Sequence, residues 1–238
     1  MNVIAVLWLR QLKRYVRSRA RIVGALGQPL LFLLGLGFGL GPVFEKAGQG
    51  NYIQFLAPGV VAMTVLFTSV FSGIELIWDR QFGFLKETLV APVPRLTIMI
   101  GRTLGGATVA TIQGLVVLAI CTLAGFRAGG LGALPAALGF MALIALTFTA
   151  LGTAIASVLQ DFQGFQLVMN LLVMPIFFLS GALFPLSHVP RALALAASVD
   201  PLAYGVDGLR SALIGLSHFG AGTDLAVLAA LSDRKSVV

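Results

Sequence analysis

Charge and cysteine are both scarce in this chain of 238 residues, and each shortage excludes a class of protein. Charged residues make up only 11% of the sequence, whereas 58% are hydrophobic and the mean hydropathy is +0.98. This composition is typical of an all-α, polytopic membrane protein. Cys121 is the single cysteine, which excludes a disulfide framework and a thiolate metal site and predicts a small core residue. Because a spanning helix needs about 20 apolar residues, the length allows about five or six spans and no separate soluble domain.

Sequence signatures of catalysis and nucleotide binding are also missing. The chain has no G-x-x-x-x-G-K-[ST] phosphate loop, which excludes ATP binding in that manner, and no H-E-x-x-H or G-x-S-x-G motif. Neither His188 nor His218 has acid or thiol neighbours at ligand spacing, so we predict no catalytic, cofactor-binding or metal residue. An intramembrane enzyme could use Ser180 with His188 as its base. That pair lacks a third residue, and helix packing explains Ser180 better.

Ionisable residues are nearly absent from the apolar stretches, and Glu75 is the sole candidate within them. It lies one helical turn before Asp79 on the same face, close enough to the interface to reach water or pair with an arginine. We therefore expect a coupling or pairing role for Glu75. An ion-coupled carrier, which normally needs charged groups at the membrane midplane, is the alternative.

The N-terminal segment 1–21 is basic and contains no acidic residue. At 100° per residue it divides into an apolar stripe and a basic face, which predicts an amphipathic helix lying in the membrane interface. The stripe consists of Ile4, Trp8, Leu12 and Tyr15, and the basic face of Arg10, Lys13, Arg14, Arg17 and Arg21. Arg19 falls outside that face and is expected to snorkel to the headgroups. Anionic lipid thus explains the net charge of +7 better than nucleic acid does. A solvated basic arm is the alternative.

Long apolar runs predict five spans and a sixth that is incomplete. The five runs are 22–44, 55–78, 103–126, 135–159 and 165–184. The loop 79–102 carries four basic residues, whereas 45–54 and 127–134 carry one each, so the N-terminus and the 79–102 loop are expected on the cytoplasmic side. Proline and charge interrupt 185–222, which predicts short external or re-entrant helices. A sixth span should follow from 223, but the apolar stretch covers only 223–231 and is followed by an atypical tail, 232–238. We expect a truncated sixth span, the alternative being five spans with an external C-terminus.

The segment 79–95 is charged, punctuated by glycine and proline, and placed between two apolar spans on the basic side. Phe82, Leu85 and Leu89 can share one helical face, with Arg80 and Glu87 on another. Proline at 92 and 94 ends that helix. An apolar patch flanked by charge suits a groove on a cytoplasmic partner. A connector that lies in the lipid interface without a partner is the alternative.

Four stretches in order along the chain carry a family resemblance. They are FLAPG (55–59), DRQFGFLKETLVAPVPR (79–95), LSGALFPLSHVP (179–190) and DPLAYGVDGLR (200–210). With them the chain resembles the ABC-2 type permeases of bacterial ABC exporters, in particular the daunorubicin-resistance-type drug efflux permeases. The resemblance implies a multi-pass permease of the bacterial inner membrane, usually a homodimer or a pseudo-dimer with a related permease. It also implies that ATP and Mg are bound by a separate ATP-binding subunit, so that this chain is not itself an enzyme.

The resemblance further implies a division of labour along one ABC-2 transmembrane domain, 1–231. The expected parts are an interfacial helix at 1–21, two spans at 22–78, a cytoplasmic coupling loop at 79–102, three spans at 103–184, an external lid region at 185–222 and a partial span at 223–231. ATPase docking is expected at Asp79, Arg80, Phe82, Gly83, Phe84, Leu85, Lys86 and Glu87, and an external lid around Gly181, Pro185, Pro190, Pro201 and Arg210. An apolar path suits amphipathic drugs or lipid-like substrates. Export of polysaccharide or lipid-linked saccharide is the alternative within the family.

Overall fold

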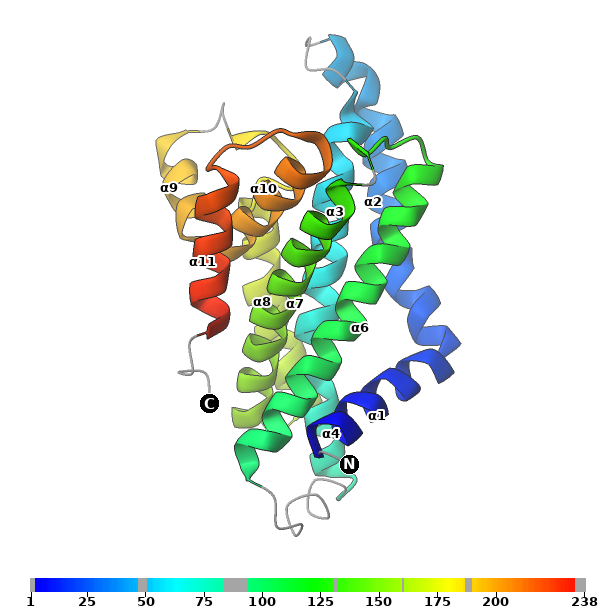
Figure 1. Cartoon of the computed structure of the whole chain (residues 1–238), viewed down its shortest axis with the longest axis vertical. Coiled ribbons are helices and arrows are strands. Elements are labelled where there is room, and N and C mark those ends of the chain that lie inside the picture. The colour runs from blue at the N-terminus through cyan, green and yellow to red at the C-terminus, as the bar shows by residue number, and fades with distance from the viewer. Residues whose placement is uncertain are drawn as a thin grey trace.

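The computed structural model describes residues 3–46, 51–83, 94–130, 132–159, 161–186 and 190–233, without the side chains of 20, 21 and 233. Within these ranges the regular structure is helical, with no strand, which confirms the predicted all-α fold (Figure 1). The helices are α1 Val3–Arg17, α2 Arg19–Lys46, α3 Tyr52–Phe71, α4 Ile74–Gln81, α6 Arg95–Leu123, α7 Ala133–Val158, α8 Phe162–Leu179, α9 Arg191–Val199, α10 Pro201–Ile214 and α11 Ala221–Asp233.

Five stretches of helix are long and apolar enough to cross a membrane. They are Ile22–Lys46, Tyr52–Gln81, Arg95–Leu123, Ala133–Val158 and Phe162–Leu179, and each overlaps one predicted span. The second contains both α3 and α4, because the helix is interrupted at Ser72 and Gly73. α11 is a shorter apolar helix, and it begins close to the place where the sequence predicts a partial sixth span.

α3 forms the centre of the bundle, with most of its side chains buried. Two glycines allow close contact between backbones at its ends. A side chain at Gly59 would collide with the Ala182 backbone, and one at Gly73 with the Gly152 carbonyl. Backbone atoms cannot move aside as a flexible side chain can, so only glycine permits these approaches. Cys121 is fully buried in the surrounding core, which confirms that prediction.

α2 lies along one side of the bundle and leans away from it at the end near α1 (Figure 1). It packs mainly against α3, with Leu33 buried, whereas Val23, Leu31 and Phe38 are exposed. This outward face is apolar along its length. A surface of this kind is expected of a helix whose outer face meets lipid rather than water.

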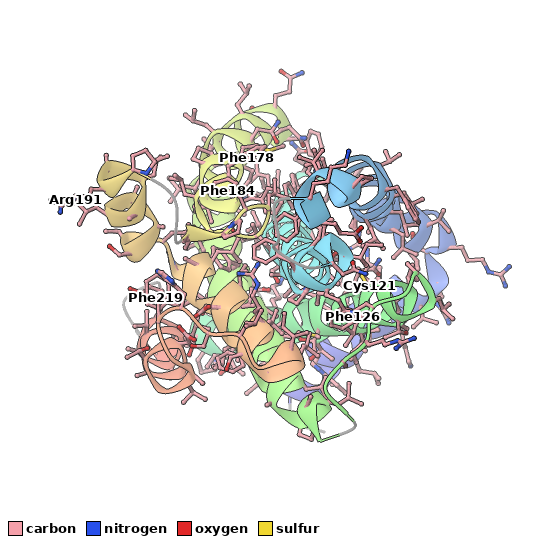
Figure 2. The ribbon with its side chains drawn as sticks, turned by 90° about the horizontal axis from the view of Figure 1, so that it is seen from above. Cys121, Phe126, Phe178, Phe184, Arg191 and Phe219 are labelled. Atoms are coloured by element: carbon pink, nitrogen blue, oxygen red, sulfur yellow. The ribbon has the colours of Figure 1, made fainter. Side chains whose placement is uncertain are left out.

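The other end of the bundle holds α9, α10 and the start of α11, opposite the end that holds α1 and α4 (Figure 1). Asp200 caps α10 by accepting a bond from the Leu202 N–H at 2.9 Å, and Pro201 occupies its first turn. Gly215 ends the helix in the left-handed conformation, with φ 72°. Seen from this end, Arg191 of α9 lies at the outer edge of the molecule (Figure 2). The interrupted segment thus forms short helices, as its proline pattern predicts.

Candidate functional site

α1 crosses α6 near the end of the bundle, and two glycines of α6 make this contact close. Gly101 lies against Leu7, and Gly105 lies against Gln11 of α1. The Trp8 Nε1–H donates to the Thr108 Oγ1 at 3.0 Å, and the Tyr15 hydroxyl donates to the Gln113 side-chain oxygen. The apolar stripe of α1 is therefore partly covered by α6, with Tyr15 of the stripe buried. Leu7, which lies outside the predicted stripe, is buried as well.

Two carboxylates on α4, Glu75 and Asp79, lie one turn apart beneath α1, and both are buried. Asp79 accepts a charged hydrogen bond from Arg102 of α6 at 2.6 Å. The side chains of Asp79 and Arg102 are only 8% and 5% exposed. A buried carboxylate of this kind requires a paired cation, and Arg102 supplies it.

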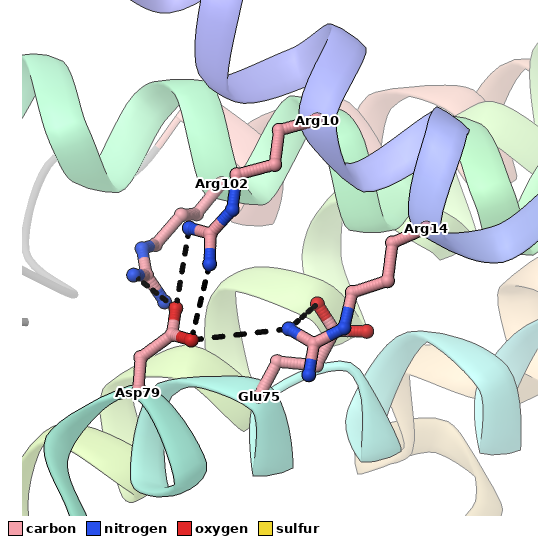
Figure 3. Close-up of polar contacts among 5 residues, drawn as sticks. All are labelled: Arg10, Arg14, Glu75, Asp79 and Arg102. Atoms are coloured by element: carbon pink, nitrogen blue, oxygen red, sulfur yellow. Dashed lines mark hydrogen bonds and ion pairs between the residues drawn. The ribbon is translucent and has the colours of Figure 1, made fainter. Parts of the chain in front are cut away.

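Two arginines of α1 complete the cluster (Figure 3). Arg10 donates through both terminal nitrogens to the two oxygens of Asp79, at 3.3 and 3.4 Å. Arg14 lies 3.8 Å from Glu75 and 3.8 Å from Asp79, and its guanidinium is 6.0 Å from the Trp78 ring centre. Asp79 thus joins α1, α4 and α6 through one carboxylate. We name Arg10, Arg14, Glu75, Asp79 and Arg102 the charge cluster.

The predicted docking segment begins inside this cluster. Asp79 is occupied as described, and Arg80 donates to the Leu159 and Ser157 carbonyls at 3.0 and 2.9 Å, at the end of α7. Phe82, by contrast, is 83% exposed, and Gly83 turns the chain with φ 78°. The remaining predicted docking residues, 84–87, lie outside the described residues.

Between α2 and α3 lies a crevice of about 390 Å³, which we name the α2–α3 crevice. It is lined by Gly24, Ala25, Gln28, Pro29, Met63, Thr64, Phe67, Thr68 and Phe71. None of these residues is charged, and the polar groups are the Gln28 amide and two threonine hydroxyls. Pro29 lies inside α2 and has no N–H, so the usual helical bond to the Ala25 carbonyl is absent.

Two of the predicted lid residues, Gly181 and Pro185, lie beside the buried Arg210 at the opposite end of the bundle. Arg210 donates to the Gly181 carbonyl at 3.2 Å and to the Phe55 carbonyl at 3.5 Å, and its guanidinium lies 4.0 Å from the Phe55 ring centre. Burial lowers the pKa of Arg210 to about 10, although the nearby Asp207 raises it. Pro185 and Arg210 line one small cavity at this end of the bundle. Pro190 precedes α9, and Pro201 is the first residue of α10.

Neither catalytic nor metal chemistry emerges from the part of the chain that the structure describes. No group of three or more His, Cys, Asp or Glu side chains in it could hold a metal ion. The Ser180 hydroxyl donates to the Phe177 carbonyl at 2.7 Å, and His188 lies outside the described residues. The His218 N–H donates to Asp207 at 2.8 Å, which ties down the loop after α10.

Two partners in this site were missed from the sequence. The charge pattern predicts Arg102 in the 79–102 loop, whereas in the structure it lies within α6 and pairs with Asp79. Arg102 follows Gly101, a glycine that permits close packing of helices. An arginine at such a packed position needs an acidic partner, so this neighbourhood indicates an ion pair. Gln113, a polar residue within a span, likewise signalled a partner, which is Tyr15.

Comparison with known proteins gives consistent matches over nearly the whole chain. A family model described as ABC-2 type transporter matches residues 2–214. Nodulation protein J of Rhizobium leguminosarum bv. trifolii is 31% identical over 230 residues, covering 90% of this chain and 82% of the relative. Nodulation protein J of Rhizobium meliloti (strain 1021) is 30% identical over 224 residues, covering 92% and 84%. The putative transport permease ycf38 of Cyanophora paradoxa is 31% identical over 207 residues, covering 84% and 69%.

Proposed function

Because the chain belongs to the ABC-2 type transporter family, we propose that it is the permease subunit of a bacterial exporter driven by a separate ATP-binding subunit. It is a multi-pass membrane protein. In the proposal it lies in the inner membrane with its N-terminus in the cytoplasm, and two copies or two related permeases form the path. The substrates are amphipathic drugs or lipid-like molecules that leave the cytoplasm.

The observation that carries the substrate class is the α2–α3 crevice. Its walls are apolar and aromatic, with Phe67 and Phe71 stacked at 6.2 Å between ring centres, and no charged side chain lines it. The Gln28 amide and two threonine hydroxyls are its polar groups. This lining suits an amphipathic molecule with limited polarity, and it offers no fixed cation for a long anionic polysaccharide.

Energy is proposed to reach the path through the segment 79–87. The sequence has no phosphate loop of its own, and the family implies an ATP-binding partner. Exposed Phe82 supports a contact with that partner at the start of the segment. Asp79 and Arg80 connect the same segment to α1, α6 and the end of α7. A push on the segment would therefore reach three other helices directly.

The proposed cycle couples this push to a change of access. ATP binding by two partner subunits moves the two 79–87 segments, and the path changes from inward to outward opening. The segment 185–222 acts as a lid at the outer end, with Arg210 fixing α10 to the start of α3. The interfacial helix α1 braces the moving helices through the charge cluster. Glu75 serves in this brace rather than as a proton carrier, because Arg14 lies beside it.

Two glycines of α2 give a matched test of the path. Gly24 lines the crevice and Gly39 does not, and a Cβ atom added at either meets no atom within 4 Å. Gly24→Leu should therefore fill the crevice without disturbing the fold, whereas Gly39→Leu adds the same bulk elsewhere. We expect both variants to co-purify with the ATP-binding subunit. Only Gly24→Leu should lose drug-stimulated ATPase activity and efflux.

Other results would contradict parts of the proposal. Equal transport by the two variants would overturn the assignment of the crevice. A chain that purifies without any ATP-binding subunit, and transports on an ion gradient alone, would overturn the exporter itself.

A further inference from the structure

A basic groove runs along α1 beside α4, on the face turned away from α6. Its volume is about 910 Å³. It is lined by Val6, Leu9, Arg10, Lys13, Arg14, Arg17, Ser18 and Asp79. Among the α1 residues, positions 6, 10, 13 and 17 follow one another at intervals of three or four, as expected for one helical face. The groove therefore presents four cationic side chains and a hydroxyl on a single surface.

Positive charge exceeds negative charge in this region. The four cations of the groove and Arg102 face two carboxylates, Glu75 and Asp79, which leaves three positive charges over. Lys13 and Arg17 are exposed, and neither forms an ion pair with any carboxylate in the described ranges. Asp79 does not repel an anion strongly here, because Arg102 and Arg10 already pair with it.

The groove continues into a hollow whose lining surface is mostly apolar. The hollow has a volume of about 320 Å³ and shares Arg14 and Ser18 with the groove. Its other walls are Phe71, Ile74, Glu75 and Trp78. Phe71 in turn lines the α2–α3 crevice. Shared residues thus connect a cationic surface, an aromatic and aliphatic passage, and an apolar crevice in one series.

We propose that this series is a binding site for an anionic phospholipid, with the headgroup phosphate between Lys13, Arg14 and Arg17 and one acyl chain passing Trp78 and Phe71. The phosphate accepts hydrogen bonds from the cations and from the Ser18 hydroxyl. The chain removes apolar surface of the hollow from water. A soluble anion could satisfy only the first half of the site. An acidic surface of a protein could likewise fill the groove but not the hollow.

Occupancy has a consequence for the charge cluster. Arg14 lies 3.8 Å from Glu75 and from Asp79, and it also lines both the groove and the hollow. A phosphate bound in the groove would therefore be held by the same guanidinium. An arginine has enough donors to serve both. The lipid would then offset the surplus positive charge and hold α1 against α4. This inference concerns binding in the membrane and does not depend on transport.

The two tryptophans of the chain, Trp8 and Trp78, provide the measurement. Trp78 lines the hollow, so bromine atoms on the acyl chain of a bound lipid should quench its fluorescence. The purified full-length chain is placed in phosphatidylcholine nanodiscs with increasing fractions of brominated phosphatidylglycerol or brominated phosphatidylcholine. The Trp8→Phe variant isolates the Trp78 signal.

Charge variants identify the site. Each basic residue beside an anionic lipid strengthens binding roughly 5-fold, so Lys13→Gln with Arg17→Gln should weaken the preference for phosphatidylglycerol roughly 30-fold. The matched control, Arg19→Gln with Arg95→Gln, removes two exposed charges outside the groove at the same end of the bundle. It should retain the preference.

Four results would overturn the proposal. The first is an equal loss of preference in both double variants, and the second is no preference for phosphatidylglycerol in the unaltered chain. The third is complete competition by inorganic phosphate. The fourth is that Lys13→Gln with Arg17→Gln loses a co-purifying ATP-binding subunit while its lipid preference stays unchanged. The third would assign the groove to a soluble anion, and the fourth to an acidic protein surface.

Discussion

Replacing Asp79 by asparagine tests whether one carboxylate holds α1, α4 and α6 together. The substitution keeps the size of the side chain but removes its charge. The Arg102 side chain is only 5% exposed, so it cannot turn to water. It would remain buried without Asp79, its only acidic partner among the described residues. Arg10 and Arg14 are 33% and 39% exposed, so both can turn to water.

The structure predicts an order among three variants. Removing one partner of a buried ion pair costs about 3–5 kcal/mol, which we expect for Asp79→Asn. Arg102→Gln should cost about 1.5–3 kcal/mol, because Asp79 keeps Arg10 and Arg14. Arg10→Gln should cost at most about 1 kcal/mol, since its contacts are long and solvent screens them. The double variant of Asp79→Asn with Arg102→Gln should be more stable than Asp79→Asn alone, because it no longer leaves the buried Arg102 guanidinium without its acid.

The free energy of unfolding can be measured by titrating sodium dodecyl sulfate into mixed micelles of the purified chain. Tryptophan fluorescence follows the transition, because Trp8 bonds α1 to Thr108 of α6 and Trp78 lies beside Arg14 of the cluster. The reasoning would be refuted if Arg10→Gln cost as much as Asp79→Asn. It would also be refuted if adding Arg102→Gln to Asp79→Asn lowered stability further.

Three further predictions concern packing, pH and docking. Gly152→Ala should cost about 1–3 kcal/mol or more in the same titration, because its side chain would meet the α3 backbone, whereas Gly139→Ala on the same helix meets nothing and should stabilise by up to about 1 kcal/mol. Burial raises the pKa of Asp200 from 3.8 to about 7 despite its bond to the Leu202 N–H, so its contribution to stability is complete below pH 3.8 and lost as pH rises towards 7. Asp200→Asn should flatten the dependence of melting temperature on pH over that interval, and an unchanged slope would contradict this. Reversing Lys86 and Glu87 together should weaken co-purification of the ATP-binding subunit without affecting membrane insertion, and unchanged co-purification would remove the docking assignment.

Apolar run length predicted the spans well because each run is bounded by charge, proline or glycine. The largest error lies at α6, which begins at Arg95 rather than at the predicted 103. The prediction stopped at Arg102 because an arginine normally marks the end of an apolar span. In the structure Arg102 is buried within the helix, and the carboxylate of Asp79 compensates its charge. The helix can therefore include a residue that hydropathy excludes.

The charge cluster itself could not be derived from periodicity. Arg10 and Asp79 are separated by 69 residues, and Arg102 lies 23 residues beyond Asp79. Helical spacing predicts contacts within a helix and says nothing about which helices meet. Helical spacing predicts a basic face on α1, but it does not indicate that two arginines of that face contact acids on α4. The packing of α1 on α6 is what brings Arg10 and Arg14 to the acids of α4 and leaves Lys13 and Arg17 exposed.

The burial of Cys121 has a practical consequence. It is the single cysteine of the sequence and its side chain is fully enclosed. Thiol reagents applied to intact vesicles should therefore leave the native chain unlabelled, so that an introduced cysteine provides the whole signal. Placing one at exposed Lys46 and another at exposed Arg95, at opposite ends of the bundle, would determine the orientation of the chain in the membrane without any background substitution.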